Sequence, residues 1–298
     1  MKLVSRAPGK VNLCLLLGPI REDGRHELVT LFESVSVADS VEVTPASAGA
    51  DEVVCPGVDG VNIVTQTLEG LRDSGWDGPP LRVVIDKRIP VAGGMGGGSA
   101  DAAAILRLAA AVDPDSAPLA AAVEELARGL GADVPSQLTP GLALGTGAGD
   151  IVEILFEPLA PHAFVIVPQG FGLSTADVYR EADRLGLARG TGELASRGRE
   201  LRGAVDAGGE LPAALLVNDL EPAALSLAPE IGSALDAVRD AGAGYSLVSG
   251  SGPTVFGVWW GPEALGLASE AAGALSDRYP GATSATPVNQ EFWVPRGS

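Results

Sequence analysis

The chain has 298 residues, 46% hydrophobic and 19% charged, a composition that predicts about two folded domains and excludes a mainly disordered protein. Its net charge of −18 argues against nucleic acid or an anionic membrane as a partner, and no apolar run is long enough to span a bilayer. Two cysteines and two histidines are too few for a disulfide framework or a His/Cys metal cage, so we expect a cytoplasmic protein that holds no metal ion of its own.

The first half of the chain predicts strands followed by helices. Apolar alternation and β-branched residues indicate the strands, and alanine-rich stretches indicate the helices. The predicted elements are a strand at 4–17, a turn at 22–24, two strands within 28–44, a helix at 61–73, a strand at 81–85, and helices at about 100–112 and 118–129.

The pattern restarts in the second half, so we predict a domain boundary near residue 157, giving domains over 1–157 and 158–298. The predicted elements there are a strand at 163–167, a helix at 175–186, helices within 211–240, a strand at 245–259 and a helix at 262–277. The polar stretch at 189–200 is interpreted as a mobile loop or a solvated connection. Residues 294–298 resemble part of a protease-cleavable tag and carry no functional argument.

A glycine-rich segment, Gly93-Gly94-Met95-Gly96-Gly97-Gly98-Ser99, lies between a predicted strand and an alanine-rich helix. Glycines without a Cβ let backbone N–H groups converge on an anion, and the start of the helix adds positive potential. The sequence lacks the lysine of a Walker A loop, the spacing of a dinucleotide-binding loop, and the H-R-D and D-F-G motifs of protein kinases. The segment therefore predicts a phosphate-binding loop of another design, with a flexible linker as the alternative.

Three further segments have both a functional and an ordinary interpretation. Lys10, in Ala7-Pro8-Gly9-Lys10-Val11-Asn12-Leu13, is one of only three lysines, yet a lysine at a turn is often a solvated charge. Asp133 follows a predicted helix in Gly131-Ala132-Asp133-Val134-Pro135, where a turn-forming acid is common. Ser249-Gly250-Ser251-Gly252-Pro253 is a tight turn before a strand, which an ordinary hairpin would also contain.

Together with the glycine-rich segment, these segments resemble the GHMP small-molecule kinases, and the resemblance runs from Arg6 to about Trp259. Further matching segments are Asp23–Leu28, Ile85–Pro90, Ser174–Tyr179 and Asn218–Glu221. The resemblance implies a two-domain α+β GHMP kinase fold. Its N-terminal domain is expected to be an α/β domain like domain 2 of ribosomal protein S5, and its C-terminal domain a ferredoxin-like α+β domain.

The resemblance also implies an ATP-dependent kinase in which Lys10 and Asp133 form a catalytic pair beside the acceptor hydroxyl. A nearby lysine holds a carboxylate ionised and favours the charge that develops during phosphoryl transfer. The residues implied in ATP binding are Asn62, Lys87, Gly93, Gly94, Gly96, Gly97, Gly98, Ser99 and Asp101. Ser99 and Asp101 could instead be helix caps. Mg²⁺ is expected with ATP, held mostly by the phosphates.

Within the family, segments 23–28 and 85–90 point to the C2 hydroxyl of 4-diphosphocytidyl-2-C-methyl-D-erythritol, in non-mevalonate isoprenoid biosynthesis, as the acceptor. The implied acceptor-binding residues are Asn12, Arg25, His26, Thr175 and Tyr179. His26 would offer a donor and an acceptor to the edge of a cytosine, although it could also be an ordinary loop histidine. Tyr179 would offer a stacking face, although it could also be a core tyrosine. The family usually has an aromatic residue where this chain has Arg25, whose guanidinium plane can also stack on a base.

Two other functions stay open at this point. The same kinase chemistry on another small alcohol, such as homoserine, mevalonate or a sugar, is favoured by Arg25. A sensor of nucleotides or metabolites on the same scaffold needs no catalytic pair, so the presence of both Lys10 and Asp133 speaks against it.

Overall fold

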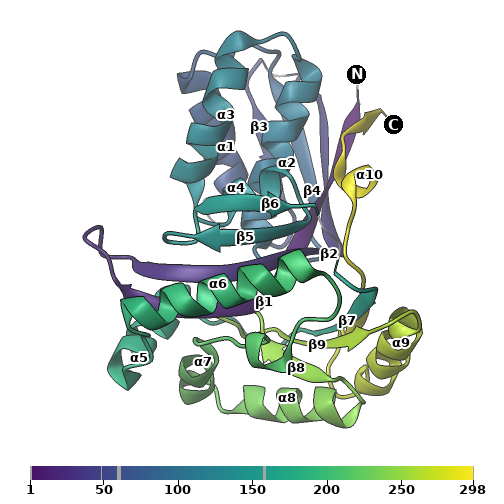
Figure 1. Cartoon of the computed structure of the whole chain (residues 1–298). Helices are drawn as coiled ribbons and strands as arrows, with labels where there is room; N and C mark the ends of the chain where they lie inside the picture. The colour runs from purple at the N-terminus through teal and green to yellow at the C-terminus, as the bar shows by residue number, and fades with distance from the viewer. Residues whose placement is uncertain (1, 48, 59–61, 157–158, 298) are drawn as a thin grey trace.

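The computed structural model describes residues 2–47, 49–58, 62–156 and 159–297, and it contains two β-sheets with helices packed on them (Figure 1). The larger sheet has the strand order β11-β1-β2-β4-β3, with β5 beside β2 and β6 beside β5. The smaller sheet has the order β10-β7-β9-β8. The boundary predicted near residue 157 lies outside the described residues.

The larger sheet is built mostly from the first half of the chain. Its strands are β1 (Leu3–Ile20), β2 (His26–Pro45), β3 (Glu52–Val54), β4 (Leu81–Asp86), β5 (Leu142–Thr146), β6 (Ile151–Leu155) and β11 (Arg296–Gly297). The helices beside it are α1 (Ile63–Asp73), α2 (Gly97–Val112), α3 (Ala117–Leu130) and the short α4 (Val134–Leu138). The alanines on one side of α2 are buried, and their small side chains let this helix pack closely on β1: Ala100, Ala102, Ala103, Ala104 and Ala109.

The prediction of two strands within 28–44 is wrong, because β2 is one strand that changes neighbours along its length. It pairs with β5 through Thr30–Glu33 and with β4 through Ser40–Pro45, while β1 runs beside both parts. Irregularities in the β1–β2 register absorb the bend between the two parts. The stretch predicted as two strands is therefore a single strand that changes its partner.

The smaller sheet is antiparallel and carries helices α8 and α9 (Figure 1). Its strands and the helices of this half are β7 (His162–Val167), α5 (Thr175–Leu185), α6 (Thr191–Ala207), α7 (Glu221–Leu227), α8 (Glu230–Asp240), β8 (Tyr245–Val248), β9 (Val255–Trp260), α9 (Ala264–Leu275) and β10 (Thr283–Ala285). The strand predicted at 245–259 is thus two strands joined by the Gly/Ser turn. Across the described residues, no helix combines the length and apolarity that crossing a membrane requires.

The polar stretch at 189–200 is neither a mobile loop nor a solvated connection, because it forms most of α6. Leu194, Leu201 and Val205 are buried on one side of this helix, which packs against β1 and β2. Just before the helix, Arg189 forms a bidentate pair with Asp219 at 2.5 and 2.6 Å. Among the other arginines of this stretch, Arg199 is exposed, whereas Arg197 is partly buried and donates to the carbonyl oxygen of Ala214.

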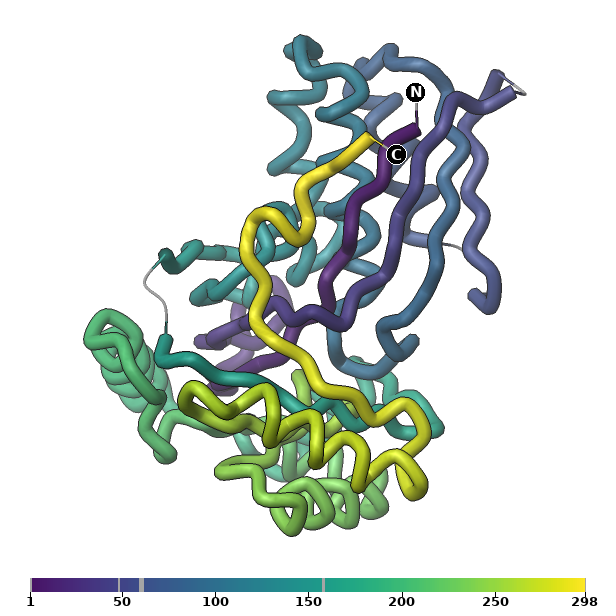
Figure 2. Tube along the Cα trace, turned by 90° about the vertical axis from the view of Figure 1, so that its right-hand side faces the viewer, coloured from purple at the N-terminus to yellow at the C-terminus, as the bar shows by residue number. Residues whose placement is uncertain are grey.

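The end of the chain returns to the larger sheet. Helix α10 (Gln290–Trp293) is followed by β11, which pairs with the first residues of β1, so the two termini lie side by side (Figure 2). The indole N–H of Trp293 donates to the carbonyl oxygen of Pro140 at 3.0 Å. The backbone carbonyl oxygen of Trp293 accepts from the hydroxyl of Ser5 at 2.7 Å. The segment after β10 thus packs on the first sheet.

A buried charged pair joins the two sheets away from the cavity described below. His162, on β7, places Nε2 2.8 Å from Oε2 of Glu33 on β2 and Nδ1 2.7 Å from the carbonyl oxygen of Ala160. Both partners accept hydrogen bonds, so both ring nitrogens carry hydrogen and the ring is an imidazolium. Burial works against this charge, but the bonds to Glu33 outweigh it and raise the pKa of His162.

This pair predicts a pH-dependent contribution to stability. Because the folded-state pKa of His162 lies above the unfolded value of about 6.5, the contribution is complete below that pH and is lost as pH rises through the folded pKa. We expect His162→Gln to be less stable than the wild type by an amount that is largest near pH 6 and shrinks toward about pH 9. Urea unfolding across this range measures the difference, and a difference independent of pH would contradict the prediction.

Candidate active site

A cavity of about 1200 Å³ lies between the two halves of the molecule and is lined from both. All the residues that the sequence predicts for ATP, acceptor and catalysis line it, although they come from segments far apart in the chain. The first half contributes β1, β2, the glycine-rich loop and the start of α4. The second half contributes α5 and the turn between β8 and β9. For each motif, its position and contacts in this cavity decide between the functional interpretation and the ordinary one.

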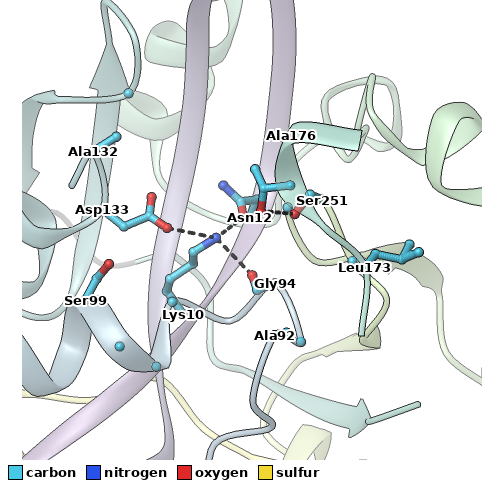
Figure 3. Close-up of a pocket in the computed structure, with 18 of the residues that line it drawn as sticks. Lys10, Asn12, Ala92, Gly94, Ser99, Ala132, Asp133, Leu173, Ala176 and Ser251 are labelled. Atoms are coloured by element: carbon cyan, nitrogen blue, oxygen red, sulfur yellow. Dashed lines mark hydrogen bonds and ion pairs between the residues drawn. The ribbon is translucent and has the colours of Figure 1, made fainter. Parts of the chain in front are cut away.

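Lys10 is buried at the centre of the cavity lining, with 4% of its surface exposed. Its Nζ lies 2.7 Å from Oδ1 of Asn12, 3.0 Å from the carbonyl oxygen of Gly94 and 3.7 Å from Oδ2 of Asp133 (Figure 3). Two hydrogen bonds thus fix the ammonium beside the carboxylate. A solvated charge is excluded, because water has little access to this side chain.

Asn12 is itself held by a chain of hydrogen bonds that runs into β2. Its Nδ2 donates to Oγ1 of Thr30 at 2.8 Å, and that hydroxyl donates to the carbonyl oxygen of Cys14 at 2.8 Å. This order fixes which end of the amide faces Lys10, because only the amide oxygen can accept from the ammonium. Asn12 therefore orients Lys10 as well as lining the cavity.

Asp133 occupies the N-cap position of α4, but its side chain makes no capping bond. The carboxylate instead points toward Lys10 and is one-third exposed, at 33%. A turn or capping acid would direct its oxygens to nearby backbone N–H groups. The interpretation as an ordinary turn acid is therefore wrong for the side chain, which is left free to accept a proton or hydrogen bond from a ligand.

The glycine-rich loop ends directly in α2, which begins at Gly97, earlier than predicted. Gly96 is the N-cap residue with φ +67°, and no side chain caps the helix. The alternative that Ser99 or Asp101 caps this helix is thus wrong. The first N–H groups of a helix have no partner within it, so here they are open to an anion in the cavity.

The turn between β8 and β9 packs against this loop. Ser249 donates to the carbonyl oxygen of Gly94 at 3.0 Å, and the backbone N–H of Thr254 donates to the carbonyl oxygen of Gly93 at 3.2 Å. The hydroxyl oxygens of Ser251 and Thr175 lie 3.0 Å apart, and this contact connects the turn to the start of α5. The second half of the molecule thereby closes one side of the loop.

Gly94 has no room for a larger residue. A Cβ there would lie 2.1 Å from the carbonyl oxygen of Ser249, and its φ of +78° disfavours any residue with a side chain. We expect Gly94→Ala to lower kcat/KM about 10- to 100-fold, because backbone strain of this kind costs about 1–3 kcal/mol. Gly129→Ala, in α3 with no atom near its Cβ, is the control. An unchanged kcat/KM for Gly94→Ala would contradict the prediction.

Lys87 lies between two buried carboxylates at the side of the loop. Its Nζ is 2.7 Å from Oδ2 of Asp101 and also bonds Asp39, which accepts from the backbone N–H groups of Arg88 and Ile89. Burial opposes the charge on Lys87, but the two carboxylates outweigh it and raise its pKa. Burial raises the pKa of Asp101 to about 7, with Lys87 opposing and Asp39 adding to the effect. Asp101 thus holds Lys87 beside the phosphate loop.

Asn62, the other residue predicted near the nucleotide, lines the cavity at the start of α1. Its Oδ1 accepts from the backbone N–H of Val64 at 2.9 Å, so it caps this helix. Its amide oxygen is therefore committed to the helix, and a role of Asn62 in binding stays a prediction.

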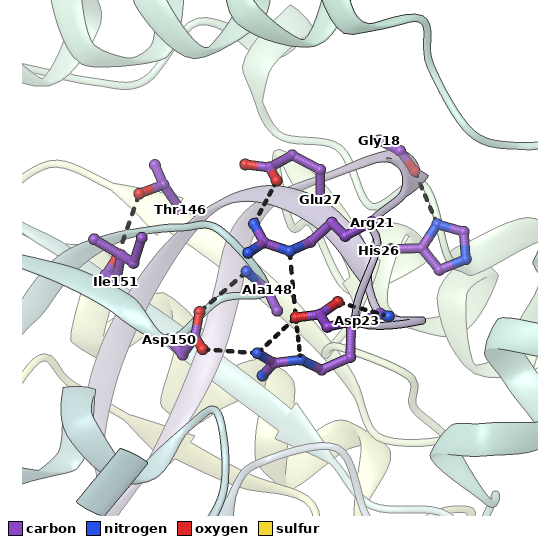
Figure 4. A network of polar contacts seen from close by, with 10 residues as sticks. Gly18, Arg21, Asp23, His26, Glu27, Thr146, Ala148, Asp150 and Ile151 are labelled. Carbon is purple, nitrogen blue, oxygen red and sulfur yellow. Dashed lines mark hydrogen bonds and ion pairs between the residues drawn. The ribbon is translucent and has the colours of Figure 1, made fainter. Parts of the chain in front are cut away.

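Arg25 lies in the turn that joins β1 to β2 and is held there by two acids, Asp23 and Asp150, which Figure 4 shows side by side. Its guanidinium lies 3.0 Å from Asp23 and 3.2 Å from Asp150, and half of the side chain is exposed. Asp150 also accepts from the backbone N–H of Ala148 at 3.1 Å. The plane of the guanidinium is thus held at the cavity wall, where stacking on a base stays a prediction.

His26 and Tyr179 meet across the cavity wall, with ring centroids 5.6 Å apart. Nδ1 of His26 lies 2.8 Å from the carbonyl oxygen of Gly18, and the residue is 6% exposed (Figure 4). Tyr179 packs on a small apolar cluster and also lines the cavity. It is therefore both a core tyrosine and an accessible ring, and burial raises the pKa of its hydroxyl.

Comparison with known proteins agrees with this geometry. The model of the GHMP kinases N terminal domain matches residues 62–141, and that of the GHMP kinases C terminal domain matches 199–279. The chain is 40% identical over 261 residues to 4-diphosphocytidyl-2-C-methyl-D-erythritol kinase of Streptomyces coelicolor, covering 85% of this chain and 86% of that one. It is 44% identical to the protein of that name from Rhodococcus jostii over 265 residues, which are 85% and 82% of the two chains. The chain belongs to the GHMP kinase family.

Solved structures place this GHMP kinase by its fold. A crystal structure of 4-(cytidine 5′-diphospho)-2C-methyl-D-erythritol kinase superposes with a TM-score of 0.75 at 30% identity, covering 96% of this chain and all of the other. A homoserine kinase from Cytophaga hutchinsonii gives a TM-score of 0.64 at 20% identity, which shows the shared fold alone. The predicted fold class, a two-domain α+β GHMP kinase fold, is confirmed.

Three polar residues of the site were not predicted from the sequence: Thr30, Asp39 and Asp183. Thr30 and Asp39 are on β2, and both face residues of the predicted motifs only because of strand register. Asp183, on α5, lies one helical turn after Tyr179 and lines the cavity. The helical spacing of Tyr179 and Asp183 is the one signal in the sequence that could have identified any of the three.

The described residues of this GHMP kinase hold no group of three or more His, Cys, Asp or Glu side chains arranged to bind a metal ion. The acids nearest the loop are Asp101 and Asp133, one committed to Lys87 and the other facing Lys10. A magnesium ion brought by ATP would therefore take most of its ligands from phosphates and water.

Proposed function

We propose that this GHMP kinase transfers the γ-phosphoryl group of ATP to the C2 hydroxyl of 4-diphosphocytidyl-2-C-methyl-D-erythritol, a step of non-mevalonate isoprenoid biosynthesis. The observation that carries the proposal is the position of Lys10 and Asp133, in one cavity with a phosphate-binding loop and a His26–Tyr179 pair. The identity of 40–44% to kinases named for this substrate over 85% of the chain supports it.

The loop and its neighbours account for ATP. The open N–H groups at the start of α2 donate hydrogen bonds to the phosphates, and Gly96 lets the phosphates approach Lys10 and Asp133, which lie within 3.5 Å of where its Cβ would be. Gly97 lies against Lys87, whose Nζ would be 3.3 Å from a Cβ there. We assign the nucleotide to this side, with Asn62 and Lys87 near its base and ribose and Gly93, Gly94, Gly96, Gly97, Gly98, Ser99 and Asp101 around its phosphates.

The catalytic pair accounts for the acceptor hydroxyl. Its oxygen attacks the γ-phosphorus, the bond from that phosphorus to the β–γ bridging oxygen breaks, and ADP leaves with the bond's electron pair. The hydroxyl proton passes to Asp133, whose carboxylate has no competing bond to the helix it precedes. Lys10 stabilises the negative charge on the transferring phosphoryl group. Its ammonium is held in position by hydrogen bonds to Asn12 and to the carbonyl oxygen of Gly94. Mg²⁺ bound to ATP would neutralise phosphate charge.

The remaining assignments follow from the same proposal. Arg25, His26, Thr175 and Tyr179 surround the cytidyl part of the acceptor, and Asn12 lies beside its reacting hydroxyl. We also propose that the chain forms two domains, one over residues 1–157 and one over residues 158–298. Cys14 and Cys55 are free thiols, which agrees with a cytoplasmic enzyme.

The test is ADP release with Mg²⁺ and three acceptors side by side: the cytidyl-methylerythritol compound, homoserine and mevalonate. Turnover with the cytidyl compound alone is the expected result. Turnover with another alcohol alone would support kinase chemistry but contradict the proposed acceptor. ATP binding without turnover of any alcohol would favour a sensor.

One observation favours the second candidate, a kinase of another small alcohol. Arg25 stands at the cavity wall where the family usually has an aromatic ring, and two acids hold it. A charged group there would suit an anionic acceptor. Competition by cytidine nucleotides separates the two candidates, because only a cytidyl site would bind them.

A further inference from the structure

One carboxylate at the acceptor side of the cavity has no role in the proposal above. Oδ1 of Asp183 lies 3.1 Å from Nε2 of His26, and both residues line the cavity. The Asp183 side chain is 44% exposed and that of His26 is 6% exposed. Asp183 is therefore the accessible member of a pair whose other member is fixed in the protein.

The carbonyl oxygen of Gly18 determines which nitrogen of His26 faces Asp183. A carbonyl oxygen only accepts, so Nδ1, 2.8 Å away, carries a hydrogen. Nε2 is then the nitrogen turned to the carboxylate, to which it donates when protonated. In that form the pair presents an N–H donor and a carboxylate acceptor whose N and O atoms lie 3.1 Å apart.

We propose that Asp183 is a specificity residue that accepts a hydrogen bond from the exocyclic amine of cytosine while Nε2 of His26 donates to the adjacent ring nitrogen. The inference rests on the proposed function, in which the acceptor carries a cytosine. Carboxylates pair with the N4 amine of cytosine. Uracil has a carbonyl oxygen at that position, which would face the Asp183 carboxylate without a hydrogen between them.

Two features of the site favour this arrangement. In the ligand-free protein the Asp183 carboxylate lies at ion-pair distance from Nε2, 3.1 Å away, so both groups are already placed for the edge of one base, and binding would give each of them a hydrogen bond. Tyr179 precedes Asp183 by one turn of α5, and its ring centroid lies 5.6 Å from that of His26. One face of α5 thus carries a flat ring for stacking and an acceptor for the edge of the same base.

The test titrates cytidine 5′-diphosphate and uridine 5′-diphosphate into the full chain saturated with ADP and Mg²⁺, so that the phosphate loop is occupied. We expect the wild type to prefer the cytidine compound about 10- to 100-fold, the range of one two-point base contact. Asp183→Asn should reduce this preference below about threefold, because an amide can turn its oxygen toward cytosine or its NH₂ group toward uracil.

Asp177→Asn is the matched control, since Asp177 is on the same helix with a similarly exposed side chain, at 48%, and lines a separate surface groove. It should keep the wild-type preference. With the cytidyl alcohol as substrate, Asp183→Asn should raise KM and leave kcat within about twofold, as expected for lost binding that is equal in ground and transition states. A wild type without base preference, or an Asp183→Asn variant that keeps it, overturns the inference. A wild type that turns over no cytidyl alcohol overturns the proposed function instead.

Discussion

Asp133→Asn should lower kcat about 10²- to 10⁴-fold, the range for loss of a positioned general base. The substitution keeps the size of the side chain and removes its ability to accept the hydroxyl proton. Because Asp133 makes no capping bond in α4, the change removes no hydrogen bond that holds the fold. ADP release at saturating ATP and acceptor measures kcat, and calorimetric titration with ADP shows whether nucleotide binding is kept.

Two comparisons separate a catalytic from a structural effect of this change. Asp115→Asn replaces an exposed acid in the turn between α2 and α3 and should leave kcat and thermal stability unchanged. Asp133→Asn should melt within a few degrees of the wild type, since it loses only a partly exposed ion pair with Lys10. A variant that keeps kcat within about threefold of the wild type would remove Asp133 from the base role, because such bases contribute far more.

The central parts of the site could be predicted from the sequence because each is carried by a short segment. Lys10, the glycine-rich loop and Asp133 have neighbours in the chain that mark them, and the fold brings them into one cavity. The Gly/Ser turn before β9 is equally local. Where glycines or a turn determine the backbone, the residue types alone constrain what the segment can do.

The residues that escaped prediction depend on pairing between distant segments. Asp39 meets Lys87 because β2 and β4 pair with Ser40 opposite Asp86, and nothing near Asp39 in the sequence marks that register. Thr30 supports Asn12 for the same reason. Helix α6 was missed because its apolar residues are sparse, and burial of one narrow side against β1 and β2 outweighs its polar composition. Tertiary contacts decide these features, and a single sequence does not show them.

The group Lys87, Asp39 and Asp101 predicts the largest change in stability. Lys87→Met leaves the carboxylates of Asp39 and Asp101, whose side chains are at most 3% exposed, without the cation that contacts both of them. Breaking a buried ion pair from one side costs about 3–5 kcal/mol of unfolding free energy. Urea titration should show a loss of that order. Arg82→Met, which removes an exposed pair with Glu52, should cost less than about 1 kcal/mol.

The same argument predicts how the loss can be reversed. Lys87→Met combined with Asp101→Asn removes one of the stranded charges and should recover part of the stability, which simple loss of packing by the lysine stem would not allow. Burial already holds the pKa of Asp101 at about 7 with Lys87 present, and removing that cation raises it further. A carboxyl group with a raised folded-state pKa binds a proton more tightly when folded, so stability falls as pH rises. The deficit of Lys87→Met should therefore be smaller near pH 5 than near pH 8, and a deficit equal at both would show that the stranded carboxylates are not its cause.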